Sequence, residues 1–160
     1  MLTKAQNKFL YDTLMELRDG HLDSRNKPRT ETYGGYIWYI TGPVAFCNKE
    51  EYGTSIFNSK MFEPVKLIGL FKSELLDAEP LAVTGCLLET TNFNNKKVTL
   101  IKFTLENGKA MWLDKKLVKL LPPNEYEYRA VYNKHTVYCL KGDELRGIIM
   151  SFRAEEEGLK

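Results

Sequence analysis

The chain has 160 residues, of which 43% are hydrophobic and 28% are charged, and its formal net charge is +2. This length suits one domain with a buried core, and the composition is that of an ordinary globular protein. The small net charge by itself indicates neither a nucleic-acid binder nor an enzyme for acidic substrates. Any basic surface must therefore be local.

The first predicted element is an amphipathic helix that begins after Thr3 and ends at about Asp19. Thr3 and Gln6 fit a capping box, and Gly20 suits the position just after the helix. Apolar side chains recur at helical spacing and predict the face that packs on the core. They are Phe9, Leu10, Leu14 and Leu17.

The same helix carries a second stripe at helical spacing, which is basic and partly aromatic. It consists of Lys4, Lys8, Tyr11, Met15 and Arg18. One interpretation is an ordinary solvated surface. The other is a surface on which Lys4, Lys8 and Arg18 contact phosphate groups. The pattern alone leaves both open.

Residues 21–32 are polar and net basic without periodicity, which predicts a mobile loop. Residues 33–47 are densely apolar and predict a hairpin that turns at Thr41-Gly42-Pro43. Gly34-Gly35 lacks the spacing of a phosphate-binding glycine motif. We expect the hairpin's aromatic side chains in the core, and base stacking is the alternative.

The middle of the chain has weaker patterns. Thr54–Phe57 predicts a short strand, and Val65–Leu76 predicts a helix despite Gly69. Leu81–Glu89 predicts a strand with a glycine inside it.

The clearest pattern lies in residues 97–153. Val98–Leu105 and Ala110–Leu113 alternate as strands around Asn107-Gly108, a hairpin signal in which both residues can take positive φ. Asp114 is the predicted N-cap of a short helix over Lys115–Leu121. That helix places leucines inward at 117, 120 and 121 and three lysines outward. The lysines are Lys115, Lys116 and Lys119.

Three further strands are predicted after Pro122-Pro123, over residues 126–132, 136–140 and 145–152. Residues 154–160 predict a frayed acidic tail. No linker or low-complexity tract divides the sequence, so we predict one domain over residues 1–160. Each half contains a helix followed by strands, and the predicted fold class is α+β with antiparallel sheets.

No motif of catalysis or metal binding is present, so we expect a non-enzymatic protein without cofactor or metal. His21 and His135 are the two histidines, and neither belongs to a recognisable catalytic or zinc pattern. Cys47, Cys86 and Cys139 are odd in number and lack a CxxC pair, which favours buried reduced thiols. The absence of a signal region or a membrane span predicts a cytoplasmic protein.

The order of elements resembles a DNA sliding-clamp domain of the bacterial DNA polymerase III β-subunit type. The resemblance covers residues 81–153: a strand, the hairpin at Asn107-Gly108, the short leucine-bearing helix and three closing strands. The last run, Gly147–Arg153, resembles the family's closing strand, with Ser151 where proline is usual. Tyr39-Ile40-Thr41-Gly42 resembles a family turn but lacks its aspartate.

The resemblance implies a clamp-like fold in which two or three helices pack on one face of the antiparallel sheets. It also implies a processivity factor of DNA replication, as a phage-type relative or as a homo-oligomer, because one chain supplies one domain of a ring. The residues that would contact duplex DNA independently of sequence are Lys4, Lys8, Arg18, Lys115, Lys116 and Lys119.

Two other classes stay open at this stage. The first is a phage or mobile-element interaction module that binds a replication protein without DNA contact, through residues 33–47 and the tail. The second is a small enzyme in which His21 or His135 lies in a pocket beside a carboxylate.

Overall fold

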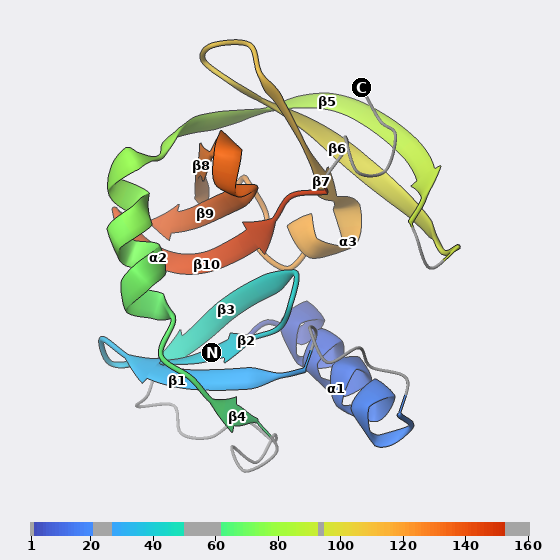
Figure 1. Ribbon diagram of the computed structural model, residues 1–160, viewed down its shortest axis with the longest axis vertical. Coiled ribbons are helices and arrows are strands. Elements are labelled where there is room, and N and C mark those ends of the chain that lie inside the picture. Colours follow the sequence, from blue (N-terminus) through green and yellow to red (C-terminus); the bar gives the residue numbers. More distant parts are fainter. Residues whose placement is uncertain (1, 21–26, 50–61, 93–94, 153–160) are drawn as a thin grey trace. The chain divides into compact units, whose positions relative to one another are not determined.

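The computed structural model describes residues 2–20, 27–49, 62–92 and 95–152 (Figure 1). This part of the chain contains three α-helices and ten β-strands, and the strands pair mostly in antiparallel fashion. The predicted α+β class is therefore confirmed. The chain divides into two compact units, residues 1–73 and 74–160. The single domain predicted over residues 1–160 stays a prediction, because compact units can belong to one domain.

The first unit has a small sheet and a long N-terminal helix. Its strands lie in the order β4-β1-β2-β3, with β1 and β4 parallel and the other neighbours antiparallel. The elements are α1 (Lys4–Arg18), β1 (Arg29–Tyr33), β2 (Tyr36–Ile40), β3 (Val44–Lys49), β4 (Glu63–Pro64) and α2 (Ile68–Glu74). The last residue of α2 belongs to the second unit.

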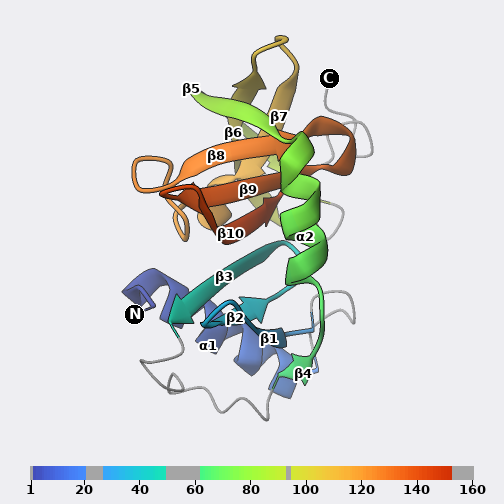
Figure 2. The same cartoon turned by 90° about the vertical axis from the view of Figure 1, so that its left-hand side faces the viewer.

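The N-terminal helix forms as the sequence predicts. The Thr3 hydroxyl accepts a hydrogen bond from the Gln6 N–H at 3.1 Å, and the Gln6 side chain accepts one from the Thr3 N–H at 2.9 Å. Leu10 and Leu14 are buried, and the Phe9 ring meets the Phe46 ring of β3 edge-on at 6.3 Å. These contacts attach the apolar face of α1 to the sheet (Figure 2).

The predicted loop over residues 21–32 is wrong at its C-terminal end, because β1 begins at Arg29. The sequence does not show this strand clearly because most of its residues are polar. Apolar and polar residues barely alternate in it, and none of them is fully buried. It turns into β2 through Gly34-Gly35, with φ values of 61° and 83°. Two positive φ values in a two-residue connection match a hairpin turn that only residues such as glycine adopt readily. Residues 21–26 of the predicted loop lie outside the described residues.

The second unit holds most of the sheet structure, with strand order β10-β9-β8-β5-β6-β7. Figure 2 shows β8, β9 and β10 side by side. The elements are β5 (Glu79–Thr91), β6 (Lys97–Leu105), β7 (Ala110–Asp114), α3 (Lys115–Val118), β8 (Glu127–Val131), β9 (Thr136–Lys141) and β10 (Glu144–Met150). Short 3-10 turns cover Leu75–Asp77 and Tyr132–Lys134.

Strand β5 changes its partner along its length. It pairs with β8 only at Glu79 and Pro80, and then with β6 from Leu81 to Thr91. A bulge interrupts the second pairing at Gly85, which has a φ of 80°. The isolated glycine in the predicted strand therefore marks a bulge, as glycines inside strands often do.

The hairpin between β6 and β7 lies where the sequence predicts, but its turn differs from the predicted one. The Gly108 N–H donates to the Leu105 carbonyl at 2.9 Å, so the central residues are Glu106 and Asn107. Only Gly108 has a positive φ, at 86°. The Asn107 side chain instead accepts a hydrogen bond from the Lys109 N–H at 2.9 Å, which holds the turn locally.

The core of the second unit lies between its strands and the turn after α3. Phe103 and Tyr128 face each other with ring centroids 5.4 Å apart, and both are buried. The Tyr128 hydroxyl donates to the Leu121 carbonyl. Leu117, Leu120 and Leu121 are all buried, as the helical spacing predicts.

None of the helices in the described ranges has the length and apolar character needed to cross a membrane. The predicted strand at Thr54–Phe57 and the predicted tail at 154–160 lie outside the described residues. The end of the resemblance at Arg153 does so as well.

Candidate functional site

Three lysines gather on the short helix α3 and its first following residue, and we call them the α3 lysine cluster: Lys115, Lys116 and Lys119. Lys116 and Lys119 are exposed and Lys115 is half-buried. Within the described part of the chain, none of the three ammonium groups forms an ion pair. Their positive charge is therefore not neutralised by direct contact with a carboxylate of the described residues.

Local structure fixes the backbone beneath this cluster. The Asp114 side chain accepts a hydrogen bond from the Lys116 N–H at 2.9 Å and caps the helix. Leu117 and Val118 are 7% and 6% exposed, so the opposite side of the helix is anchored in the core. The cap and the buried side chains therefore hold the helix backbone beneath the lysines, and Lys116 and Lys119 are exposed to solvent.

The basic stripe on α1 has a different electrostatic character. Lys4, Lys8 and Arg18 are all exposed, as predicted. However, the Lys8 ammonium lies 3.0 Å from the Asp12 carboxylate, and the Arg18 guanidinium lies 3.3 Å from Asp19. Together with Glu16, these acids balance the three cations of the helix. The stripe is thus weaker than its cations alone suggest.

The six residues predicted to contact DNA fall into two groups. Lys4, Lys8 and Arg18 belong to the first unit, and the α3 lysine cluster belongs to the second. Within each unit the three residues share one helix or its end. The expectation that both groups face one DNA molecule stays a prediction.

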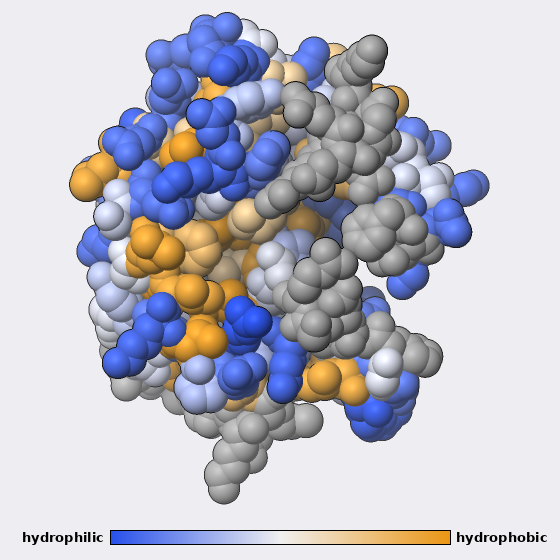
Figure 3. All heavy atoms as spheres, in the orientation of Figure 1, coloured by the Kyte–Doolittle hydropathy of each residue, from blue (hydrophilic) through white to orange (hydrophobic). Residues whose placement is uncertain are grey.

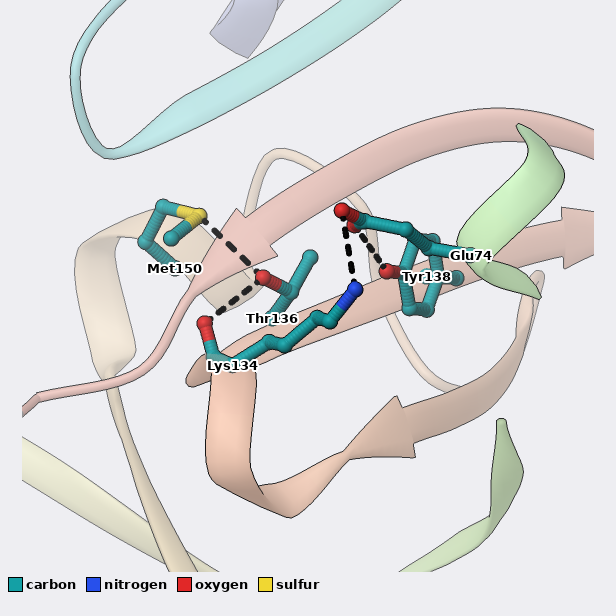
Figure 4. A network of polar contacts seen from close by, with 5 residues as sticks. All are labelled: Glu74, Lys134, Thr136, Tyr138 and Met150. Atoms are coloured by element: carbon teal, nitrogen blue, oxygen red, sulfur yellow. Dashed lines mark hydrogen bonds and ion pairs between the residues drawn. The ribbon is translucent and has the colours of Figure 1, made fainter. Parts of the chain in front are cut away.

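A polar network in the second unit joins the end of α2 to β9 (Figure 4). The Tyr138 hydroxyl donates to one carboxylate oxygen of Glu74 at 2.8 Å, and the Lys134 ammonium lies 3.1 Å from the other. Burial, reinforced by the Glu74 carboxylate, raises the pKa of the Tyr138 hydroxyl above its ordinary value. The network therefore ties the end of α2 to β9 and to the turn before it through a shared carboxylate.

The structure describes one of the two histidines, His135. His135 occupies a left-handed turn position with a φ of 53°, and its ring lies 6.4 Å from the Tyr132 ring. His21 lies outside the described residues. Searching the described ranges finds no group of three or more His, Cys, Asp or Glu residues able to hold a metal ion.

The three cysteines are reduced thiols, but their predicted burial is only partly right. Cys139 is buried and Cys47 is half-buried, whereas Cys86 is exposed. Cys86 lies beside the bulge of β5, where β6 is the one strand of the described residues that pairs with β5. The apolar run around Cys86 resembled a core strand because sequence does not show how many neighbours a strand has.

The hairpin over residues 33–47 is mainly part of the core, as expected. Its large side chains are buried at Trp38, Tyr39 and Phe46. This burial removes these three side chains from the surface that a protein-interaction module would use there, whereas Tyr33 stays exposed. The other predicted contact of such a module, the acidic tail, lies outside the described residues.

Sequence reasoning did not identify a hollow of about 500 Å³ in the first unit. It is lined by Thr30, Glu31, Thr32, Tyr33, Pro64, Val65, Lys66, Gly69 and Leu70. Hydrophobic surface gathers over α2 and the segment that leads into it (Figure 3). The available sequence signal was the number of apolar residues in the predicted helix. One of them, Leu70, is 59% exposed and so does not belong to the buried face.

The Glu31 carboxylate organises the wall of this hollow. One of its oxygens accepts hydrogen bonds from the Leu67 N–H at 2.5 Å and the Ile68 N–H at 3.0 Å. These two N–H groups lie at the start of α2, where backbone donors lack partners within the helix. A strand residue distant in sequence therefore caps α2, and no local motif could have predicted this contact.

No family model, no curated protein and no solved structure matches this chain. The resemblance to a sliding-clamp domain therefore stays a prediction, and function must be inferred from the surfaces described above.

Proposed function

We propose that the chain is a non-enzymatic, clamp-like protein that contacts the backbone of duplex DNA without reading its sequence. The observation that supports this most is the α3 lysine cluster. Its three ammonium groups lie close together in sequence on an anchored helix, and none of them pairs with a carboxylate of the described residues. Such groups can release counterions from DNA phosphates, which is the main source of non-specific affinity.

We further propose a clamp-like arrangement in which the helices pack on one face of the antiparallel sheets. In that arrangement Lys4, Lys8 and Arg18 of α1 add contacts to the same DNA. Since Lys8 and Arg18 already have acidic neighbours, we assign them the smaller share. A ring built from several copies and a role in processive replication would follow from the same resemblance.

Binding of a fluorescein-labelled duplex, followed by anisotropy over a series of salt concentrations, tests the proposal. The key variant is K115Q/K116Q/K119Q. We expect it to bind more weakly and to lower the slope of log affinity against log salt by up to about 2.7, which is the value for three lost phosphate contacts.

The matched control is K96Q/K97Q/K109Q, which removes three exposed lysines from the same unit and changes the net charge equally, from +2 to −1. If both variants bind alike, bulk charge explains the affinity and the α3 lysine cluster is not the contact surface. If the wild-type chain fails to bind duplex even at the lowest salt, the proposed function is wrong.

A further inference from the structure

The hollow in the first unit has an open strand edge as one of its walls. Strand β1 pairs with β2 along its whole length, from Arg29 to Tyr33. On its other side it pairs with the very short β4, which reaches only Pro64. The edge of β1 is therefore covered at its start, and its end lies along the hollow.

The direction of the backbone groups on this edge follows from their register. The Pro28 and Thr30 carbonyls accept hydrogen bonds from the Glu63 and Val65 N–H groups, at 3.2 and 3.0 Å. Polar groups of alternate residues point to the same side of a strand. The N–H and carbonyl of Thr32 therefore point away from β2, one step beyond the last bond to the β4 segment. No described residue pairs with them on that side.

Apolar groups stand beside this edge. Tyr33 is 36% exposed and Leu70 is 59% exposed, and both line the hollow with Val65. A Cβ atom built on Gly69 would still be 3.8 Å from the Tyr33 ring. That separation is an ordinary van der Waals contact, so the Tyr33 ring and the backbone of α2 at Gly69 are adjoining walls of the hollow.

The charge of the hollow favours an acidic ligand. Among the described residues that line it, Glu31 is the one acid, and its carboxylate already accepts two backbone hydrogen bonds. Lys66 lines the hollow and is exposed. The Lys72 ammonium lies 5.9 Å from the centre of the Tyr33 ring at the same place.

From these features we propose that the hollow binds an extended peptide segment that adds a strand to β1. Its backbone pairs with the N–H and carbonyl of Thr32, and an apolar side chain lies between Tyr33 and Leu70. Neighbouring acidic side chains face Lys66 and Lys72. Recognition of this kind takes affinity from main-chain bonds and selectivity from side-chain pockets. It does not depend on the proposed DNA contact, whose main part, the α3 lysine cluster, lies in the other unit.

A blocked hexapeptide of alternating valine and glutamate, titrated into the ¹⁵N-labelled full chain, tests this proposal by NMR. We expect amide signals of Tyr33, Lys66, Gly69 and Leu70 to move. T32P removes the outward N–H and leaves the bonds to β2, whereas T32V keeps that N–H. We expect T32P to bind about fivefold more weakly than T32V, since one net hydrogen bond is worth about this factor.

A peptide whose central valine is N-methylated probes the pairing from the ligand side with wild-type protein, so the test survives if T32P fails to fold. Equal affinity of the methylated and unmethylated peptides would overturn strand addition. Equal affinity of a valine–lysine peptide would overturn the acidic class. Signal changes that lie outside the hollow, or none at millimolar peptide, would overturn the site itself.

Discussion

Gly147 of β10 lies directly against the side chain of Leu121, which follows α3. A Cβ atom built on Gly147 would be 2.5 Å from Leu121 Cδ1 and 2.6 Å from Cδ2, closer than real atoms approach. Leu121 is fully buried, and its carbonyl accepts the hydrogen bond from Tyr128. The Leu121 side chain therefore has little space into which it could move. Packing in this place requires a glycine at position 147.

We expect G147A to destabilise the chain by about 1–3 kcal/mol, the usual cost of one excess carbon in a packed core. Urea denaturation followed by Trp fluorescence measures it. In the double variant G147A/L121A the new methyl group enters the space left by the leucine, so G147A should cost less there than in the wild-type chain. An equal cost in both backgrounds would contradict the clash.

The cap that Glu31 supplies to α2 gives a second prediction. E31A removes the acceptor of the Leu67 and Ile68 N–H groups, and we expect a loss of about 1–2 kcal/mol in the free energy of unfolding. E31Q keeps a neutral acceptor and should lose less. Hydrogen exchange should quicken at the start of α2 in E31A. A stability unchanged from wild type would show that the bond contributes nothing.

Tyrosine hydroxyls and a cysteine thiol are buried in β8 and β9, and we expect them to make the folded chain less stable at alkaline pH. Burial raises the pKa of Tyr128, Tyr138 and Cys139 above their ordinary values. The unfolded chain loses these protons first, near about pH 8.5 for the thiol and about pH 10 for the tyrosines. The contribution of these protonated groups to the free energy of unfolding is therefore complete below about pH 8.5. It is lost as pH rises from there through about pH 10 and above.

Above about pH 10 we expect the free energy of unfolding to fall by up to about 1.4 kcal/mol per pH unit for each of the two tyrosines. Y138F removes one titrating group, so its stability should decline less steeply. Urea titrations at about pH 9, 10 and 11 give the two slopes. Equal slopes for wild type and Y138F would mean that the Tyr138 hydroxyl loses its proton at the same pH in the folded and the unfolded chain. That result would contradict the prediction.

The two basic helices should differ in their effect on DNA affinity. K4Q/K8Q/R18Q removes cations of which two have acidic neighbours, whereas K115Q/K116Q/K119Q removes three without ion pairs among the described residues. We expect the α3 variant to lower the salt slope more than the α1 variant. Anisotropy titrations of both variants against one duplex decide this, and a larger effect at α1 would reverse the assignment.

Much of the fold was predictable because its signals are local. The capping box at Thr3 and the N-cap at Asp114 are short-range hydrogen bonds, and both helices begin where these residues stand. The strands from β6 to β10 alternate strongly enough to be placed within about two residues. Their antiparallel neighbours follow from short connections.

The remaining features depend on contacts between distant residues. The sequence of β1 predicts a loop because its residues are polar, and in the structure none of them is fully buried. The hollow beside it combines β1 with residues 64–70, and its cap joins Glu31 to Leu67. The α3 lysines were predictable as a surface. The Lys8–Asp12 pair has the i,i+4 spacing of neighbouring helix side chains and was also predictable, whereas the Arg18–Asp19 contact required side-chain geometry.

The bulge in β5 has a consequence for how the protein behaves at high concentration. From Ala82 to Thr91 this strand has β6 on one side and no described strand on the other, and Val83 and Leu87 are 54% and 58% exposed. A straight apolar edge of that kind recruits strands from other molecules. The positive φ of Gly85 interrupts the edge midway, between the two exposed apolar residues. We therefore expect the backbone angle at Gly85 to oppose edge-to-edge association of this strand, which the small net charge of the chain does little to prevent.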